Sequence, residues 1–144
     1  MARYVATVPS SRDADAAFAY MADFTNAQEW DPGVVRGERL DDGPIGLGSR
    51  FKITVKSLRE SSLVYEITEY DAAARRLVLR GTNALVISVD EISVSPSADG
   101  SGSEVTYDAD LVFRGPLRLL DPILKLSFKS IGDKAAAGLR ETIA

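Results

Sequence analysis

The residues of this sequence that could do chemistry are a few tyrosine, aspartate and arginine side chains in segments that predict β-strands. Tyr65 and Tyr107 fall on the presumed inner faces of two strands, and each offers an apolar ring and one hydroxyl. In a cavity these hydroxyls could donate hydrogen bonds to a ligand carbonyl. In a packed core they would need backbone partners instead.

Asp90 and Arg80 each have two interpretations. Asp90 interrupts an apolar strand, so an inward-facing carboxyl would have a raised pKa and could act as a base. Such a residue also occurs on the outer face of a strand or at a bulge. Arg80 ends a short strand, where it could clamp a carboxylate or lie in solvent. We therefore assign no catalytic residue, and whether the chain is an enzyme stays open.

Missing residue types exclude several kinds of site. The chain has no histidine and no cysteine, which rules out a Ser-His-Asp triad, a Cys-His pair, a histidine or thiolate metal site, and disulfides. Acid–base chemistry would fall to Asp, Glu, Tyr, Lys or Arg. Gly43, Gly46 and Gly48 do not match a dinucleotide fingerprint and predict a turn before a strand. We expect neither a metal nor a cofactor.

Charge and hydropathy narrow the possible partners. The formal net charge of −4 disfavours nucleic acid, because phosphate binding needs clustered Lys and Arg. The first residues lack the apolar run of a signal peptide, and no segment approaches the roughly 18 apolar residues of a membrane span. We expect a cytoplasmic monomer or homodimer without stable membrane insertion. Lys125 and Lys129 could attract an anionic membrane, but the net acidity favours a solvated helix face.

The elements that must position these residues follow from periodicity and turn signals. Residues 4–8 are β-prone, and we expect Pro9 to end this first strand. Ser10 with Asp13 forms an S-x-x-D capping box, which predicts an amphipathic helix over residues 11–22.

A short helix and a run of strands come next. Thr25 with Gln28 forms a second box that predicts a helix ending near Trp30. Predicted strands then cover residues 34–40, 50–55, 63–67, 77–80, 85–94 and 105–113, with a hairpin loop over residues 97–102. Strands this close together, with little helix between them, predict antiparallel pairing.

The last segment changes to a helical period. Asp121 suits the N-cap and Pro122 the first helical position, so a helix is predicted over residues 121–142. One apolar stripe is formed by Leu120, Leu124, Phe128, Ile131, Ala135 and Leu139. A second apolar group, Leu119, Ile123 and Leu126, lies to one side of it. This group could face a cavity or its mouth, or could pack on the first helices.

A simple width argument predicts a cavity. One helix is about 10 Å wide, whereas seven strands at a spacing of about 4.8 Å span more than 30 Å. The sheet must curl around the helix or leave apolar surface open, and the gap is an apolar pocket of the kind that binds small molecules. The residues expected to line it are Trp30, Phe51, Tyr65, Tyr107, Phe113, Leu124 and Phe128. For Trp30 a packing role between helices and sheet is the alternative, and for the others a plain core.

The sequence resembles the START/polyketide cyclase superfamily along nearly its whole length. The stretches that carry the resemblance are Val8-Pro9, Ala16 to Phe24, Asn26 to Pro32, Gly43 to Phe51, Glu69 to Leu77, Gly102 to Tyr107 and Gly115 to Pro122. The resemblance implies an α+β helix-grip fold: a curved antiparallel sheet of six to seven strands around a long C-terminal helix, with two short helices after the first strand. Residues 1–144 would form one ligand-binding domain.

The resemblance also frames the function. Members of this superfamily cyclise or dehydrate polyketides, carry lipids or hormones, or bind quinones or chaperones, and they share no universal catalytic residue. Our leading hypothesis is a carrier of a small hydrophobic ligand, a lipid or an aromatic polyketide-like compound. The alternatives are a polyketide cyclase/dehydrase-type enzyme using Tyr, Asp or Arg groups, and a protein-interaction module. An enzyme should show convergent polar groups in the cavity, whereas a carrier should show a nearly all-apolar lining.

Overall fold

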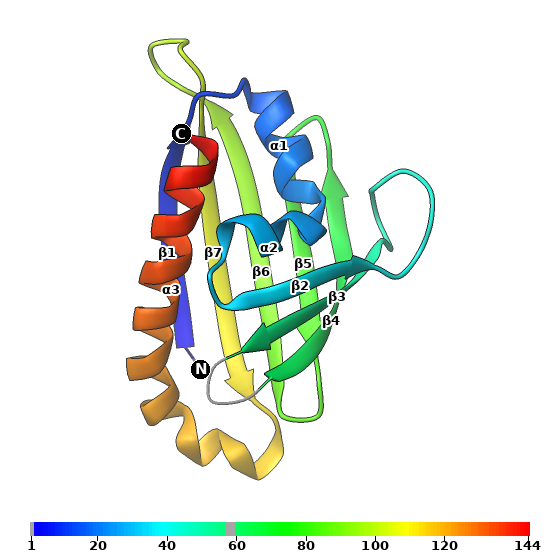
Figure 1. Ribbon diagram of the computed structural model, residues 1–144, viewed down its shortest axis with the longest axis vertical. Coiled ribbons are helices and arrows are strands. Elements are labelled where there is room, and N and C mark those ends of the chain that lie inside the picture. Colours follow the sequence, from blue (N-terminus) through cyan, green and yellow to red (C-terminus); the bar gives the residue numbers. More distant parts are fainter. Residues whose placement is uncertain (1, 57–59) are drawn as a thin grey trace.

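The computed structural model describes residues 2–56 and 60–144, apart from the side chains of Asp121 and Leu124. It contains one seven-stranded antiparallel sheet with the strand order β1-β7-β6-β5-β4-β3-β2 (Figure 1). The strands are β1 (Ala2–Ser10), β2 (Val34–Arg39), β3 (Arg50–Lys56), β4 (Glu60–Asp71), β5 (Arg76–Thr82), β6 (Val86–Pro96) and β7 (Ser103–Phe113). The predicted α+β helix-grip architecture is confirmed.

The helical segments of the described chain cover one face of this sheet, except where the chain between β7 and the long C-terminal helix extends past its end (Figure 1). They are α1 (Ala14–Ala22), the 3-10 helix η1 (Phe24–Asn26), α2 (Ala27–Trp30), the 3-10 helix η2 (Gly115–Leu120) and α3 (Asp121–Ile143). The long helix α3 packs along β1, whereas α1 packs over β6 and β7 and α2 lies between α3 and β2 (Figure 1). The predicted order of strand, two short helices, strands and long helix is confirmed.

The first strand is longer than predicted. Pro9 does not end it, because Pro9 pairs with Glu104 of β7 and β1 continues to Ser10. β1 is an edge strand, where a residue without a backbone N–H is tolerated.

The predicted capping box of Ser10 with Asp13 is wrong, because Ser10 is not the N-cap of the helix. Helix α1 begins at Ala14 rather than at residue 11, and its N-cap is Asp13, whose carboxylate accepts a hydrogen bond of 2.8 Å from the backbone N–H of Ala16. The buried Ser10 hydroxyl instead donates to the carbonyl of Ile143 over 2.8 Å. Ser10 is therefore part of the contact between β1 and the end of α3.

The predicted capping box of Thr25 with Gln28 is also wrong, because neither side chain makes the expected capping hydrogen bond. The carboxylate of Asp23, not Thr25, caps η1 by accepting from the N–H of Thr25 over 3.2 Å. The Gln28 side chain accepts from the N–H of Gly37 on β2. The segment nevertheless ends at Trp30 as predicted.

The two ends of α3 differ in their surroundings. The helix starts at Asp121, which is its first residue rather than its predicted N-cap, and Leu120 holds the cap position without a side-chain hydrogen bond. Near the other end, Leu139 and Ile143 are fully buried in the core cluster. A Cβ on Gly138 would lie 2.0 Å from the carbonyl oxygen of Trp30, so only glycine allows α3 to approach α2 this closely.

Candidate functional site

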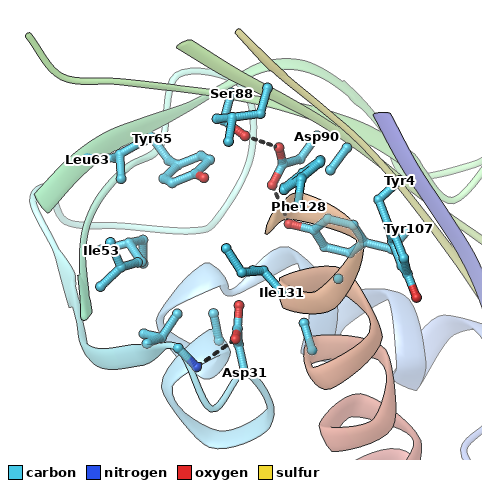
Figure 2. Close-up of a pocket in the computed structure, with 18 of the residues that line it drawn as sticks. Tyr4, Asp31, Ile53, Leu63, Tyr65, Ser88, Asp90, Tyr107, Phe128 and Ile131 are labelled. Carbon is cyan, nitrogen blue, oxygen red and sulfur yellow. Dashed lines mark hydrogen bonds between the residues drawn. The ribbon is translucent and has the colours of Figure 1, made fainter. Parts of the chain in front are cut away.

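A cavity of about 440 Å³ lies between the inner face of the sheet and α3 (Figure 2). This volume falls within the range of small-molecule sites. Apolar side chains from both sides form most of the wall, among them Phe24, Ile53, Leu63, Phe113, Phe128 and Leu139. The cavity predicted from the width of the sheet is therefore present.

One end of the cavity reaches the surface. Of the residues that line it, Lys56, Ser61, Leu85 and Ile131 are exposed. They belong to β3, β4, the turn between β5 and β6, and α3. A ligand could enter between these elements.

A chain of polar side chains crosses the sheet wall of this cavity. Ser88 and Asp90 are two residues apart on β6, so both point to the same face. The Ser88 hydroxyl donates to Oδ1 of Asp90 over 2.7 Å, and the Tyr107 hydroxyl on β7 donates to Oδ2 of the same carboxylate (Figure 2). Asp90 is only 4% exposed. Inside the protein this carboxylate thus has a partner on each oxygen.

Burial dominates the acid–base properties of the pair. It raises the pKa of Asp90 to about 6, although the hydrogen bonds from Ser88 and Tyr107 lower the pKa and so offset part of the effect. Burial also raises the pKa of Tyr107 well above its usual value, and the charge on Asp90 raises it further. At neutral pH Asp90 is therefore mainly a carboxylate that accepts protons more readily than an ordinary aspartate.

Tyr65 lies near this polar chain on β4, which β5 separates from β6. Its hydroxyl lies close to Ser88 and is directed into the cavity (Figure 2). Burial raises its pKa, so it stays a hydroxyl that can donate a hydrogen bond. Gly81 makes room for it, because a Cβ there would lie 2.5 Å from the Tyr65 ring. We call Tyr65, Ser88, Asp90 and Tyr107 the polar cluster.

A second carboxyl, that of Asp31, lines the cavity on the side away from the polar cluster (Figure 2). Asp31 follows α2 and accepts a hydrogen bond of 2.9 Å from the N–H of Gly33. Burial raises its pKa, and its charge in turn raises the pKa of Asp90. The only basic side chain among the described lining residues is that of Lys56 at the exposed end. The electrostatic potential inside the cavity is therefore negative.

Most of the residues predicted to bind a ligand lie on the cavity wall, namely Trp30, Tyr65, Tyr107, Phe113 and Phe128. Trp30 fills both roles considered for it, since it lines the cavity and its ring also packs edge-on against Tyr107 with centroids 5.6 Å apart. Phe51 is fully buried in the core beside Phe24, and it is not among the described lining residues. The side chain of Leu124 lies outside the described residues.

Two other candidates have clear positions. Asp90 faces inward, which is the first of its two interpretations, while Arg80 on β5 is exposed and is not on the described cavity wall. Sequence reasoning did not single out Ser88 or Asp31. Ser88 could have been found, because it shares a period of two with Asp90, Ile92 and Val94. Asp31 follows the predicted helix and looks like an ordinary turn residue.

The described residues hold no group of three or more Asp or Glu side chains placed to bind a metal ion. In the same part of the chain, no helix combines the length and apolar character that a membrane crossing needs.

Comparisons with solved structures agree with the fold. A structure from Thermus thermophilus aligns with a TM-score of 0.76 and 14% identity, covering 99% of this chain and 95% of that one. The Zhui aromatase/cyclase from Streptomyces sp. R1128 aligns with a TM-score of 0.75 and 14% identity, covering 98% and 90%. A START superfamily protein from Mycobacterium smegmatis gives a TM-score of 0.75 and 15% identity, covering 98% and 96%.

The sequence comparisons identify the family. No curated protein sequence matches this chain. The family described as polyketide cyclase/dehydrase and lipid transport matches over residues 1–144, the full length given. With the helix-grip fold and its cavity, this match shows that the chain belongs to the polyketide cyclase/dehydrase and lipid transport family.

Proposed function

We propose that this protein binds a small, mainly apolar ligand in the cavity and orients it through a hydroxyl or carbonyl group at the polar cluster. The observation that carries this proposal is the Ser88–Asp90–Tyr107 chain inside a mainly apolar cavity. Buried polar groups are costly unless they are hydrogen-bonded, so a ligand oxygen or hydroxyl is a favourable occupant beside Tyr65.

The charges on the wall refine the ligand class. Asp31 and Asp90 make the interior negative, and the only basic group on the described wall lies at the exposed end. A ligand carboxylate would be desolvated next to like charges, which is strongly unfavourable. We therefore propose a neutral ligand, such as a polycyclic phenol or ketone, rather than a free fatty acid.

A matched pair of probes tests this proposal. Trp30 is the only tryptophan and lies on the cavity wall, so its fluorescence reports occupancy. At about pH 8, 2-naphthol should quench Trp30 with saturation, and 2-naphthoate should bind at least about tenfold more weakly. Failure of both probes to bind would contradict a ligand cavity, and equal binding would contradict the charge argument.

A hydroxyl deletion locates the bound group. Tyr65→Phe removes the hydroxyl beside which the ligand oxygen would lie and should weaken 2-naphthol binding by about three- to tenfold, the usual worth of one hydrogen bond. Tyr20→Phe is the matched control, because Tyr20 donates to Glu29 outside the cavity. If both variants bound like the original protein, the polar cluster would not be the anchor.

A cyclase/dehydrase-type enzyme is the second candidate, favoured by the contact between Asp90 and Tyr107. The Asp90 carboxylate could take a proton from the carbon next to a ligand carbonyl. The resulting enolate carbon would attack a second carbonyl of the same chain, and Tyr65 would donate a proton to the new alkoxide, leaving Asp90 protonated. Transfer of that proton to the Tyr65 phenolate would restore both groups.

Catalysis and binding can be separated with Asp90→Asn. If the protein is an enzyme, it should convert a poly-β-ketone thioester to a cyclised isomer that liquid chromatography separates from the substrate, with a rate that rises as pH passes about 6 and Asp90 ionises. Asp90→Asn should abolish this conversion while Trp30 still reports binding. Binding without conversion by the original protein would favour the carrier.

A further inference from the structure

The first part of α3 and the preceding η2 expose large apolar side chains. Leu119, Ile123 and Leu126 are 86%, 65% and 81% exposed. These side chains are not among the described residues that line the cavity, and at these exposures they are not packed on the first helices. We call Leu119, Ile123 and Leu126, together with Arg118 and Lys125, the α3 tip. Several large apolar side chains exposed on neighbouring segments are typical of interaction surfaces.

The charges of the chain are unevenly distributed around this tip. Residues 114–129 contain four basic residues and one acidic residue, a net charge of +3, so the rest of this −4 chain carries −7. Arg114, Arg118, Lys125 and Lys129 are all exposed. The apolar tip of an acidic protein is thus its basic region, which suits a partner that is both apolar and anionic.

The helix presents different faces to the inside and the outside. At 100° per residue, Ile123 and Leu126 point about 150° away from Phe128, which lines the cavity. Lys129 lies on one flank of this outer apolar face, about 90° from its centre, and Lys125 lies further round the helix, about 130° from it. An apolar face flanked by basic residues is the pattern of helices that lie in the plane of a membrane interface.

The tip borders the open end of the cavity. Leu85, which is exposed and lines the cavity, accepts through its carbonyl a hydrogen bond of 2.8 Å from the N–H of Arg114. The Arg114 guanidinium also donates to the carbonyl of Asn83 over 2.8 Å. Figure 1 shows η2 and the first turns of α3 extending past the end of the sheet beside this β5–β6 turn. A surface bound by the tip would therefore face the cavity opening.

We propose that the α3 tip docks on the surface of a bilayer that contains anionic lipids, with Leu119, Ile123 and Leu126 inserted at the interface. Arg118 and Lys125 would lie at the level of the phosphates. A symmetric dimer through the same patch is less suited to it, since a two-fold axis would place one +3 segment against the other. This inference does not depend on which ligand the cavity holds.

Vesicle co-sedimentation of the full chain tests the docking. Vesicles of equal parts phosphatidylglycerol and phosphatidylcholine should sediment the protein, whereas pure phosphatidylcholine vesicles should sediment much less. Binding to the anionic vesicles should weaken as salt is raised, because the electrostatic part is screened. Equal binding to both vesicle types, or binding to neither, would overturn the proposal.

Variants assign the contact to the tip. Leu126→Gln should weaken partitioning into the anionic vesicles about tenfold by removing one buried leucine, and Lys125→Gln about fivefold. Leu47→Gln and Lys134→Gln are matched controls at exposed positions outside the tip, and they should bind like the original protein. All four positions are exposed, so the variants should keep the fold.

A second copy of the chain is the alternative occupant. Analytical ultracentrifugation of the same proteins distinguishes it. If the original protein is a dimer that Leu126→Gln converts to a monomer while vesicle binding is unchanged, the tip is a dimer interface and the membrane proposal is wrong. A sedimentation behaviour unaffected by Leu126→Gln, with vesicle binding lost, supports docking.

Discussion

The two halves of α3 belong to one continuous helix, yet they meet very different surroundings. In the second half, Leu139 and Ile143 are each 2% exposed, and the backbone carbonyl of Ile143 accepts hydrogen bonds from the Ser10 hydroxyl and the Ser11 N–H. In the first half, Ile123 and Leu126 are largely exposed. One end of the helix is fixed by packing, and the other is covered by little of the described protein.

Side-chain size accounts for much of this difference. The second half carries small residues where it approaches its neighbours, such as Gly132 beside the Tyr4 ring and Gly138 beside the Trp30 backbone. The first half carries larger side chains, of which Phe128 lines the cavity while Ile123 and Leu126 are exposed. The same helix therefore closes the fold at one end and exposes apolar side chains at the other.

The largest expected effect comes from truncating one leucine in each half. Leu139→Ala should lower the free energy of unfolding by about 2–5 kcal/mol, because it leaves a void in the packed half. Leu126→Ala should change it by no more than about 0.5 kcal/mol, because the side chain is already exposed. Urea denaturation followed by far-UV circular dichroism measures both. Equal losses for the two variants would mean that the halves are packed alike.

The contrast between the two halves was only partly predictable from the sequence. Apolar periodicity located α3, and the number and spacing of strands required a cavity, since one helix cannot cover so wide a sheet. Periodicity could not say how far each turn of the helix stands from the sheet. That distance depends on pairs distant in the chain, such as Gly138 with Trp30 and Ser10 with Ile143.

The residues of the candidate site were also only partly predictable from the sequence. The alternation of apolar residues placed Tyr65 and Tyr107 on inner faces, and both line the cavity. Alternation left the direction of Asp90 open, because a single bulge reverses it. The structure has register shifts in the pairing of β2 with β3 and of β4 with β5, but none between β6 and β7, which carry Asp90 and Tyr107. Local sequence does not show which strand pairs contain a bulge.

The pH dependence of stability tests how well the cavity shields Asp90 from water. The pKa of Asp90 is about 6 in the folded protein, above its ordinary value of 3.8, so the folded state binds this proton more tightly. Stability should therefore fall as pH rises from about 4 to about 7, by up to about 3 kcal/mol from this group. Asp90→Asn should remove this slope and be relatively most stabilising at the upper end of the range.

Asp108→Asn is a control for which the expected dependence of stability on pH has the opposite sign. The hydrogen bond from Arg3 lowers the pKa of Asp108, so this group stabilises the protein above the ordinary aspartate pKa and loses that contribution as pH falls through the lowered value. Asp108→Asn should thus remove a contribution that rises with pH. If Asp90→Asn left the pH profile unchanged, water would reach Asp90 through the open end, and the cavity would be wetter than its apolar lining indicates.

A substitution with a smaller expected effect tests the close contact between the C-terminal half of α3 and α2. In an isolated helix, replacing glycine by alanine gains up to about 1 kcal/mol. Gly138→Ala should instead cost about 1–3 kcal/mol, because the new Cβ would lie 2.0 Å from the Trp30 carbonyl oxygen and must push α3 away from α2. Ala137→Gly, at the exposed neighbouring position, should cost only the propensity difference of about 1 kcal/mol. Urea midpoints of the two variants measure both changes. A stabilised Gly138→Ala protein would show that α3 and α2 are not in contact there. The C-terminal half of α3 would then be packed no more tightly than the α3 tip.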